Sequence, residues 1–151
     1  MIYDRTQNDI DKAKEIILSK VNSFEELTED DLLALERGTI TQNTINRIEQ
    51  KQKELYDLFI EAGYYAPEIE IKLWENKNDF FKDADLERII ENGEILRKAF
   101  FVYTSTPERA KAIYDFTNLN AIEKLLYDLQ NMLEYVVANY RECDTFECGE
   151  E

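Results

Sequence analysis

The chain has 151 residues, of which 44% are hydrophobic and only four are Gly and two are Pro, a composition typical of one globular domain. Its 33 acidic and 18 basic residues give a net charge of −15, which argues against nucleic acid or an anionic membrane as a partner and favours a basic one. It contains no His, so the commonest general base at neutral pH is absent, and two Cys alone cannot complete a structural zinc site. We therefore expect no cofactor.

The N-terminal half of the chain predicts three helices. The first covers about residues 8–21, with Thr6 and Asp9 at the N-cap and N3 positions of a capping box. The second lies in "LTEDDLLALERG", where Thr28 is the expected N-cap and Gly38 the end. The third covers about residues 41–62 and ends before Gly63, with Gln52 as the one polar residue on its apolar stripe.

The stretch "EIEIKLW", residues 68–74, alternates polar and apolar residues and is the only strand-like pattern in the chain. We expect an extended segment without a partner strand in the chain, and therefore the likeliest element to dock on another protein. The residues assigned to that docking are Ile69, Ile71, Leu73 and Trp74. The competing interpretation is that these apolar residues cover the bundle and that Trp74 fills the core.

The C-terminal half predicts three further helices, at about residues 83–103, 106–114 and 118–140. The first of them is expected to continue through Gly93, where a neighbouring helix can approach closely. The short second one has Thr106 as N-cap and Pro107 at its first position. The fold class is therefore all-α: an irregular bundle of about five to six helices in one domain, residues 1–140, followed by a peripheral acidic tail, residues 141–151, with Cys143 and Cys148 as free thiols.

One short pattern occurs twice, each time near the start of an expected helix. It reads Ile-Asn-Arg-Ile-Glu at residues 45–49 and Leu-Asn-Ala-Ile-Glu at residues 119–123. The Asn and the Glu are three apart and share a helix face. Either they belong to the chemistry of the helix ends, with Thr41 or Asn43 and Thr117 as caps, or the two pairs meet between helices, where the Asn amides would bond to backbone or to each other. The residues of such a polar network would be Asn46, Glu49, Arg97, Asn120 and Glu123, with Arg97 neutralising a Glu.

Several stretches together carry a resemblance to a known family. They are "YDRTQNDIDKAK" (residues 3–14), "INRIEQ" (45–50), "KLW" (72–74), "ILRKA" (95–99) and "LNAIEKLLYDLQNML" (119–133). Their order resembles small tail-region structural proteins of tailed phages and prophages of Gram-positive bacteria. The C-terminal segment departs from the pattern, because Cys143 and Cys148 stand near small residues of the family's repeated Tyr-Ser-Gly-Glu. The resemblance implies a virion or assembly component.

Two hypotheses of function follow. The first is a phage tail-region structural or assembly protein that binds other tail subunits, with self-association as an open alternative and no catalysis. The second is a domain that recognises carbohydrate or peptide on the host surface, which requires Trp74, Tyr64 and Tyr65 to form an exposed aromatic cluster. The expected location is the bacterial cytoplasm during assembly and then the virion, because residues 1–11 contain no apolar stretch of a signal peptide.

Overall fold

In a computed structural model of the chain, residues 1–74 and 81–143 are described, with side chains up to residue 139. The described residues form helices and irregular segments and contain no strand, so the all-α prediction is confirmed. The elements are α1 (Gln7–Ile16), which continues as the π-helical turn η1 (Ile17–Val21), α2 (Glu29–Gly38), α3 (Gln42–Glu61), α4 (Asp83–Ala99) and α5 (Phe116–Cys143).

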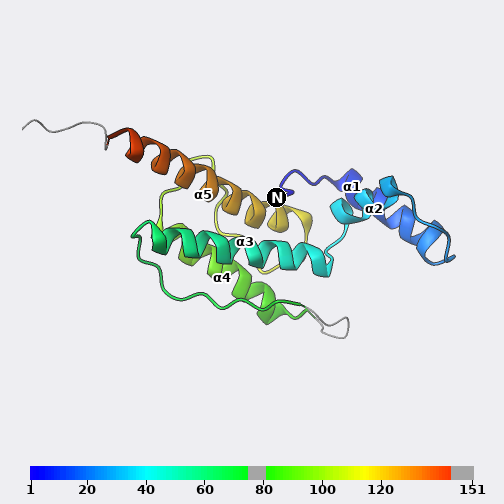
Figure 1. The fold of residues 1–151 in the computed structure, drawn as a ribbon. Helices are drawn as coiled ribbons and strands as arrows, with labels where there is room; N and C mark the ends of the chain where they lie inside the picture. The colour runs from blue at the N-terminus through cyan, green and yellow to red at the C-terminus, as the bar shows by residue number, and fades with distance from the viewer. Residues whose placement is uncertain (75–80, 144–151) are drawn as a thin grey trace, which may run out of the picture.

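The helices fall into two groups (Figure 1). The first is a bundle in which α3, α4 and α5 each contact the other two. The second is a hairpin of α1 and α2, which pack mainly on each other and project away from the bundle. We call this hairpin the arm. The chain starts beside α5, passes out along the arm and returns to enter α3.

The core lies between α3, α4 and α5 and is built from the apolar stripes of these helices. Phe59, Leu55, Leu96, Leu126 and Leu129 are completely enclosed. Burying each such side chain contributes about 1.5–3 kcal/mol. Further members of the cluster are Ile45, Ile48, Trp74, Leu86, Ile89, Ile90, Phe100, Leu119, Ile122, Leu125 and Leu133.

The helix starts follow the sequence closely. Thr6 and Thr28 each accept a hydrogen bond from the backbone N–H three residues later, and the Asp9 and Asp31 carboxylates accept from the cap N–H in return. Both predicted caps are confirmed. Thr41 caps α3 in the same way through Thr44. α5 starts differently, because Asp115 accepts from Asn118 N–H at 2.7 Å, so Thr117 is not its cap.

At three positions the structure gives a different reason for the presence of a glycine. Gly63 has φ +84° and ends α3, with the N–H of Tyr64 bonded to the carbonyl of Phe59 at 2.8 Å, as predicted. At Gly93 the Cδ2 of Leu125 is 3.3 Å from where a Cβ would stand, so α4 continues through it and α5 lies close. Gly38 lets α2 touch α1: a Cβ there would be 2.2 Å from the carbonyl oxygen of Asp9.

Two predictions about helices are wrong: the end of one helix and the presence of another. α4 ends at Ala99 instead of residue 103, because the backbone turns to the β region at Phe100, whose ring then packs on Phe59. The helix predicted at residues 106–114 is a turn and an irregular segment. Its expected cap, Thr106, donates its hydroxyl to Asp128 at 2.7 Å, and the carbonyl of Pro107 accepts from Arg97 at 2.7 Å. These tertiary contacts replace the local ones that a helix needs.

The remaining segments are the predicted extended segment and the C-terminal tail. Residues 64–74 run along the bundle as neither helix nor strand. The peripheral tail and Cys148 lie outside the described residues, and of Cys143 only its place at the end of α5 is described.

Candidate functional site

The first Asn-Glu pair binds the segment that ends at Trp74. The Asn46 side chain accepts from the backbone N–H of Trp74 at 2.9 Å and donates to its carbonyl oxygen at 3.0 Å. One amide thus satisfies both backbone groups of a residue that has no secondary structure to do so. We call this arrangement, with Glu49, the α3 clamp.

Glu49 completes the α3 clamp one turn later, and its side chain is fully buried. Its carboxylate accepts from the indole N–H of Trp74 at 2.9 Å and from the backbone N–H of Lys72 at 3.3 Å. Arg88 of α4 provides the positive charge by an ion pair with the same carboxylate. A buried carboxylate is tolerated only with such partners, so Glu49 can remain buried only while these hydrogen bonds and this ion pair are formed.

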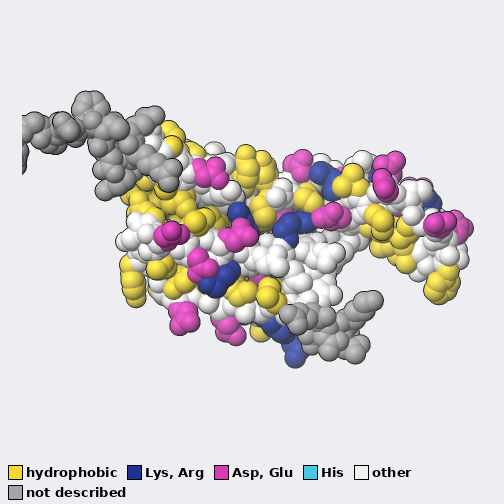
Figure 2. All heavy atoms as spheres, viewed as in Figure 1, with side chains coloured by type: hydrophobic (Ala, Val, Ile, Leu, Met, Phe, Trp, Pro, Cys, Tyr) yellow, Lys and Arg dark blue, Asp and Glu magenta, His cyan; other side chains and the backbone are white. Residues whose placement is uncertain are grey.

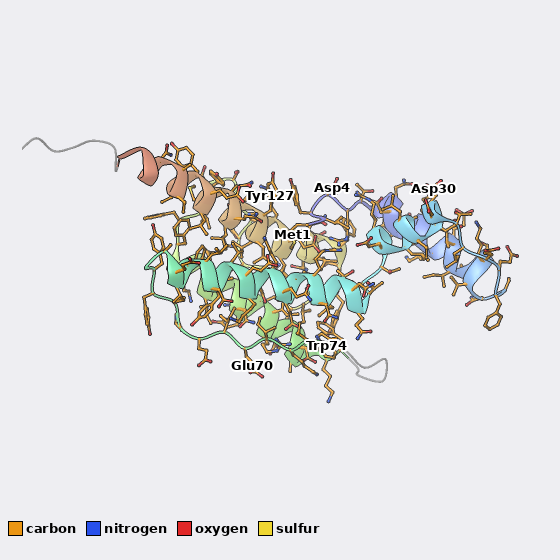
Figure 3. The ribbon with its side chains drawn as sticks, in the orientation of Figure 1. Met1, Asp4, Asp30, Glu70, Trp74 and Tyr127 are labelled. Atoms are coloured by element: carbon orange, nitrogen blue, oxygen red, sulfur yellow. The ribbon has the colours of Figure 1, made fainter. Side chains whose placement is uncertain are left out.

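The second pair, on α5, binds the start of the chain in the same manner. Asn120 accepts from the N–H of Arg5 at 3.2 Å and donates to the Arg5 carbonyl at 2.9 Å. Glu123, also fully buried, accepts from the backbone N–H of Ile2. We call this the α5 clamp. Figure 3 shows Met1 near α5 and Trp74 near α4.

Two guanidinium groups neutralise Glu123. Its Oε1 is 3.3 Å from the NH2 of Arg5 and 2.9 Å from the NH2 of Arg47, which comes from α3. Arg47 also pairs with Glu36 of α2 at 2.6 Å. A single side chain therefore ties the arm, α3 and α5 together.

The repeated sequence pattern thus has a common structural role that the network interpretation described only in part, by expecting the Asn amides to bond to backbone or to each other. Asn46 and Asn120 are not caps, and within residues 1–74 and 81–143 they share no hydrogen bond with each other. Each instead holds a non-helical segment against its helix by the backbone, while the Glu takes an N–H two or three residues earlier in that segment. Ile48 and Ile122, between Asn and Glu, face the core.

Arg97 does not have the role predicted for it. It bonds to Glu94 at 2.9 Å, one turn away on the same helix, and to the carbonyl of Pro107. Arg88, on the same helix but nearer its start, lies opposite Glu49 instead. Sequence reasoning missed Arg5, Arg47 and Arg88, because only the packing of the helices decides which Arg reaches which carboxylate.

The polar interruption of α3, Gln52, lies in a third buried contact. Its amide donates to the carbonyl of Ile89 at 2.6 Å, and Asn92 donates to Gln52 at 3.4 Å and to the carbonyl of Glu70 at 2.7 Å. The interruption in the apolar stripe was its only sequence signal. Like the α3 clamp, this contact fixes the segment of residues 64–74 to the bundle.

The four residues assigned to docking are divided by the structure. Ile69 and Trp74 are buried, Trp74 at 4% exposure, whereas Leu73 is 50% exposed and Ile71 lies between. Lys72 stands over the indole ring, 3.7 Å from its centroid. Trp74, Tyr64 and Tyr65 therefore do not form one exposed aromatic cluster. Tyr64 packs on Phe59 and Phe100, and only Tyr65 points outward.

Two carboxylates of the arm have strongly perturbed acidity. The pKa of Asp9 is lowered to about 2 by hydrogen bonds from Arg37 and Thr6. The pKa of Asp31 is likewise lowered to about 2, by Lys20 and Thr28. Both are capping residues, so these shifts report helix-end chemistry in the arm.

A hollow of about 770 Å³ lies between the first part of α4 and residues 109–112. It is lined by charges of both signs, and Arg109 pairs with Glu91 at 3.0 Å across it. It therefore selects neither an anion nor a cation. No cluster of three or more His, Cys, Asp or Glu suited to a metal ion occurs among the described residues.

None of the helices described here has the length and apolar character needed to cross a membrane. The chain matches no family model, no curated protein and no solved structure.

Proposed function

We propose that this chain is a tail-region structural or assembly protein of a phage or prophage, and that it acts by binding other proteins without catalysis. The observation that carries the binding role is the arm, which leaves the bundle and exposes large apolar side chains, among them Leu18, Phe24 and Leu33. Isolated exposed apolar residues are ordinary, but a projecting group of them marks an interaction surface. The tail-region assignment rests on the sequence resemblance.

The absence of catalysis is part of the proposal and is supported by the use of the buried charged groups. Glu49, Glu123 and Asp128 are almost completely enclosed, so they are the carboxylates to consider first for acid–base chemistry. Each is instead occupied by an internal partner: Arg88 for Glu49, the two Arg residues for Glu123, and Lys124 with Thr106 for Asp128. These contacts are those of structural side chains.

The alternative, a recognition domain for host-surface glycan, needs Trp74 to be accessible. Trp74 is the only Trp of the chain, so its fluorescence reports this one site. With Trp74 enclosed by Phe81, Glu49 and the Lys72 side chain, acrylamide should quench the native protein far less than the unfolded one. Equal quenching in both states would favour the glycan hypothesis.

The experiment for the proposed function uses the phage or prophage that encodes the chain. Particles purified from wild-type and gene-deleted backgrounds are compared by mass spectrometry and electron microscopy. The proposal expects the chain in wild-type particles, or tails that fail to assemble in its absence. A chain that is absent from particles and dispensable for assembly contradicts it.

A further inference from the structure

The end of the arm carries five large apolar side chains that are exposed. Leu18 and Val21 lie at the end of α1 and η1, Phe24 in the turn, and Leu32 and Leu33 at the start of α2. Phe24 is 96% exposed, and Leu18 is 71% exposed. We call these five residues and the chain between them the arm tip. Figure 2 shows hydrophobic side chains on the arm with acidic ones beside them.

The turn at the arm tip holds its aromatic ring outward by a defined backbone. Phe24 has φ +56°, a left-handed conformation that a bulky residue rarely adopts. Hydrogen bonds fix it, from the N–H of Phe24 to Val21 at 3.2 Å and from the N–H of Glu25 to Lys20 at 3.0 Å. The ring is therefore presented by an ordered turn, which reduces the entropy lost when a partner binds.

The charge around this apolar surface is mainly negative. Glu25, Glu26, Glu29 and Asp30 are all exposed, and within the described ranges none of them forms an ion pair. Of the nearby cations, Lys20 is already bound to Asp31 at 2.6 Å, and Lys14 lies one turn before Leu18 on the side of the arm tip nearer the bundle. Figure 3 shows Asp30 on the arm, far from the bundle. Four carboxylates thus surround the apolar residues without a counter-charge from the chain.

We propose that the arm tip is a docking site for a protein segment whose apolar residues are flanked by Lys or Arg. The apolar side chains provide the anchors, and the carboxylates select the partner and accelerate its association. A second copy of this chain would bring the same carboxylates and be repelled, as would an anionic membrane. The inference rests on the proposed function, for which it names the binding surface and the chemistry of the partner.

The test uses a fluorescent amphipathic peptide of about 18 residues, long enough for a bound helix, with Leu on one face and Lys on the other. Anisotropy titrations compare the wild-type protein with two tip variants. The first, Phe24→Ser with Leu33→Ser, removes apolar anchors. The second, Glu25→Gln with Glu26→Gln, removes charge without touching any packing contact of the helices, so it stays informative if the first variant fails to fold. Melting curves check both.

Matched controls separate the arm tip from the acidic surface in general. Tyr65→Ser with Phe101→Ser removes exposed aromatic rings elsewhere, and Glu61→Gln with Glu68→Gln removes exposed charge elsewhere. We expect each tip variant to weaken binding by about tenfold or more and each control by less than about twofold. A peptide with Glu in place of Lys should not bind.

The proposal would be overturned by tip variants that bind as the wild type does, by controls that weaken binding equally, or by tip-dependent binding to phosphatidylglycerol vesicles in place of the peptide. Tip-dependent dimerisation in sedimentation equilibrium would assign the surface to a second copy and overturn it as well. None of these results depends on whether the chain is found in particles, so failure of the arm-tip site and failure of the tail assignment are read separately.

Discussion

The side-chain amide of Asn46 pairs with both backbone groups of Trp74, and Asn120 does the same for Arg5. Two helices that differ in sequence thus use one arrangement to hold a segment that has no secondary structure. The segment gains the hydrogen bonds that a neighbouring strand would otherwise supply. The Glu three residues later adds a buried charge that only a particular Arg can neutralise, so the arrangement specifies where the segment lies as well as stabilising it.

Truncating either Asn should therefore destabilise the fold. Asn120→Ala leaves the N–H and the carbonyl of Arg5 without their partner, and Asn46→Ala leaves the N–H of Trp74 without its partner, whereas the Trp74 carbonyl keeps its bond from Gln42. We expect each substitution to cost about 1–3 kcal/mol. Asn43→Ala, on the exposed side of the first turn of α3, should cost less than about 0.5 kcal/mol. Urea unfolding followed by circular dichroism measures all three. Equal effects at Asn43 and Asn46 would contradict the clamp.

The charge of Glu49 is tested separately by Glu49→Gln. The substitution keeps the shape of the side chain but removes the buried partner of Arg88, which is left with the Asp85 carboxylate at 3.6 Å. Removing one partner of a buried pair typically costs about 3–5 kcal/mol. Glu54→Gln on the same helix is the control, because Glu54 is exposed and pairs only with Lys51. A Glu49→Gln protein as stable as this control would show that the carboxylate is not needed.

Gly38 should be the glycine least tolerant of substitution. In Gly38→Ala the new methyl group meets backbone at the Asp9 carbonyl, which cannot move without separating α1 from α2. In Gly93→Ala it meets only the end of the Leu125 side chain, which can rotate. We expect Gly38→Ala to cost about 1–3 kcal/mol or more and Gly93→Ala less.

Because the arm packs mainly on itself, the damage from Gly38→Ala should be local. Hydrogen exchange should show lost protection in α1 and α2 with α3, α4 and α5 still protected. Loss of protection throughout the chain would show that the arm and the bundle unfold as one unit.

The arm should also respond to acid through its capping carboxylates. The pKa of Asp9 is about 2 in the folded chain, below the ordinary 3.8, because Arg37 and Thr6 bond to the ionised form. A depressed folded pKa means that the stabilisation is fully present above about pH 4 and is lost as the pH falls through about 2. Carboxyl titration by NMR should give this midpoint for Asp9, and Asp9→Asn should remove its share of the acid dependence. Asp11→Asn, on the exposed side of α1, is the control. A midpoint near 3.8 for Asp9 would contradict the capping geometry.

Much of the local structure could be predicted from the sequence, because its signals are local. Thr6 with Asp9, Thr28 with its acidic first turn, and Gly63 specify helix ends through contacts within one turn, and each lies where predicted. The failures involve contacts between distant residues. Thr106 and Pro107 have the pattern of a helix start, yet Asp128 and Arg97 take their polar groups.

In the polar network too, the local pattern could be read from the sequence and the contacts between distant residues could not. The repeated Asn and Glu identified two of the most buried polar positions, because the same short pattern occurs near the start of two helices. Their partners could not be found, because pairing Glu49 with Arg88 rather than Arg97 requires the register between α3 and α4. The assignment of residues 69–74 to docking depended on a distant contact as well. An alternating pattern does not reveal that Asn46 and Glu49 bind Trp74 and hold it buried.

The central claim is that the buried polar groups maintain the fold while the arm tip binds the partner. It is tested most directly by complementing a deletion of the gene in its phage or prophage. Three versions are supplied: wild type, Glu25→Gln with Glu26→Gln, and the control Glu61→Gln with Glu68→Gln. The chain is then quantified in purified particles by mass spectrometry. We predict that the wild type and the control are incorporated equally and that the tip variant, folded to the same melting temperature, is depleted by about tenfold. Equal incorporation of all three versions would contradict the account.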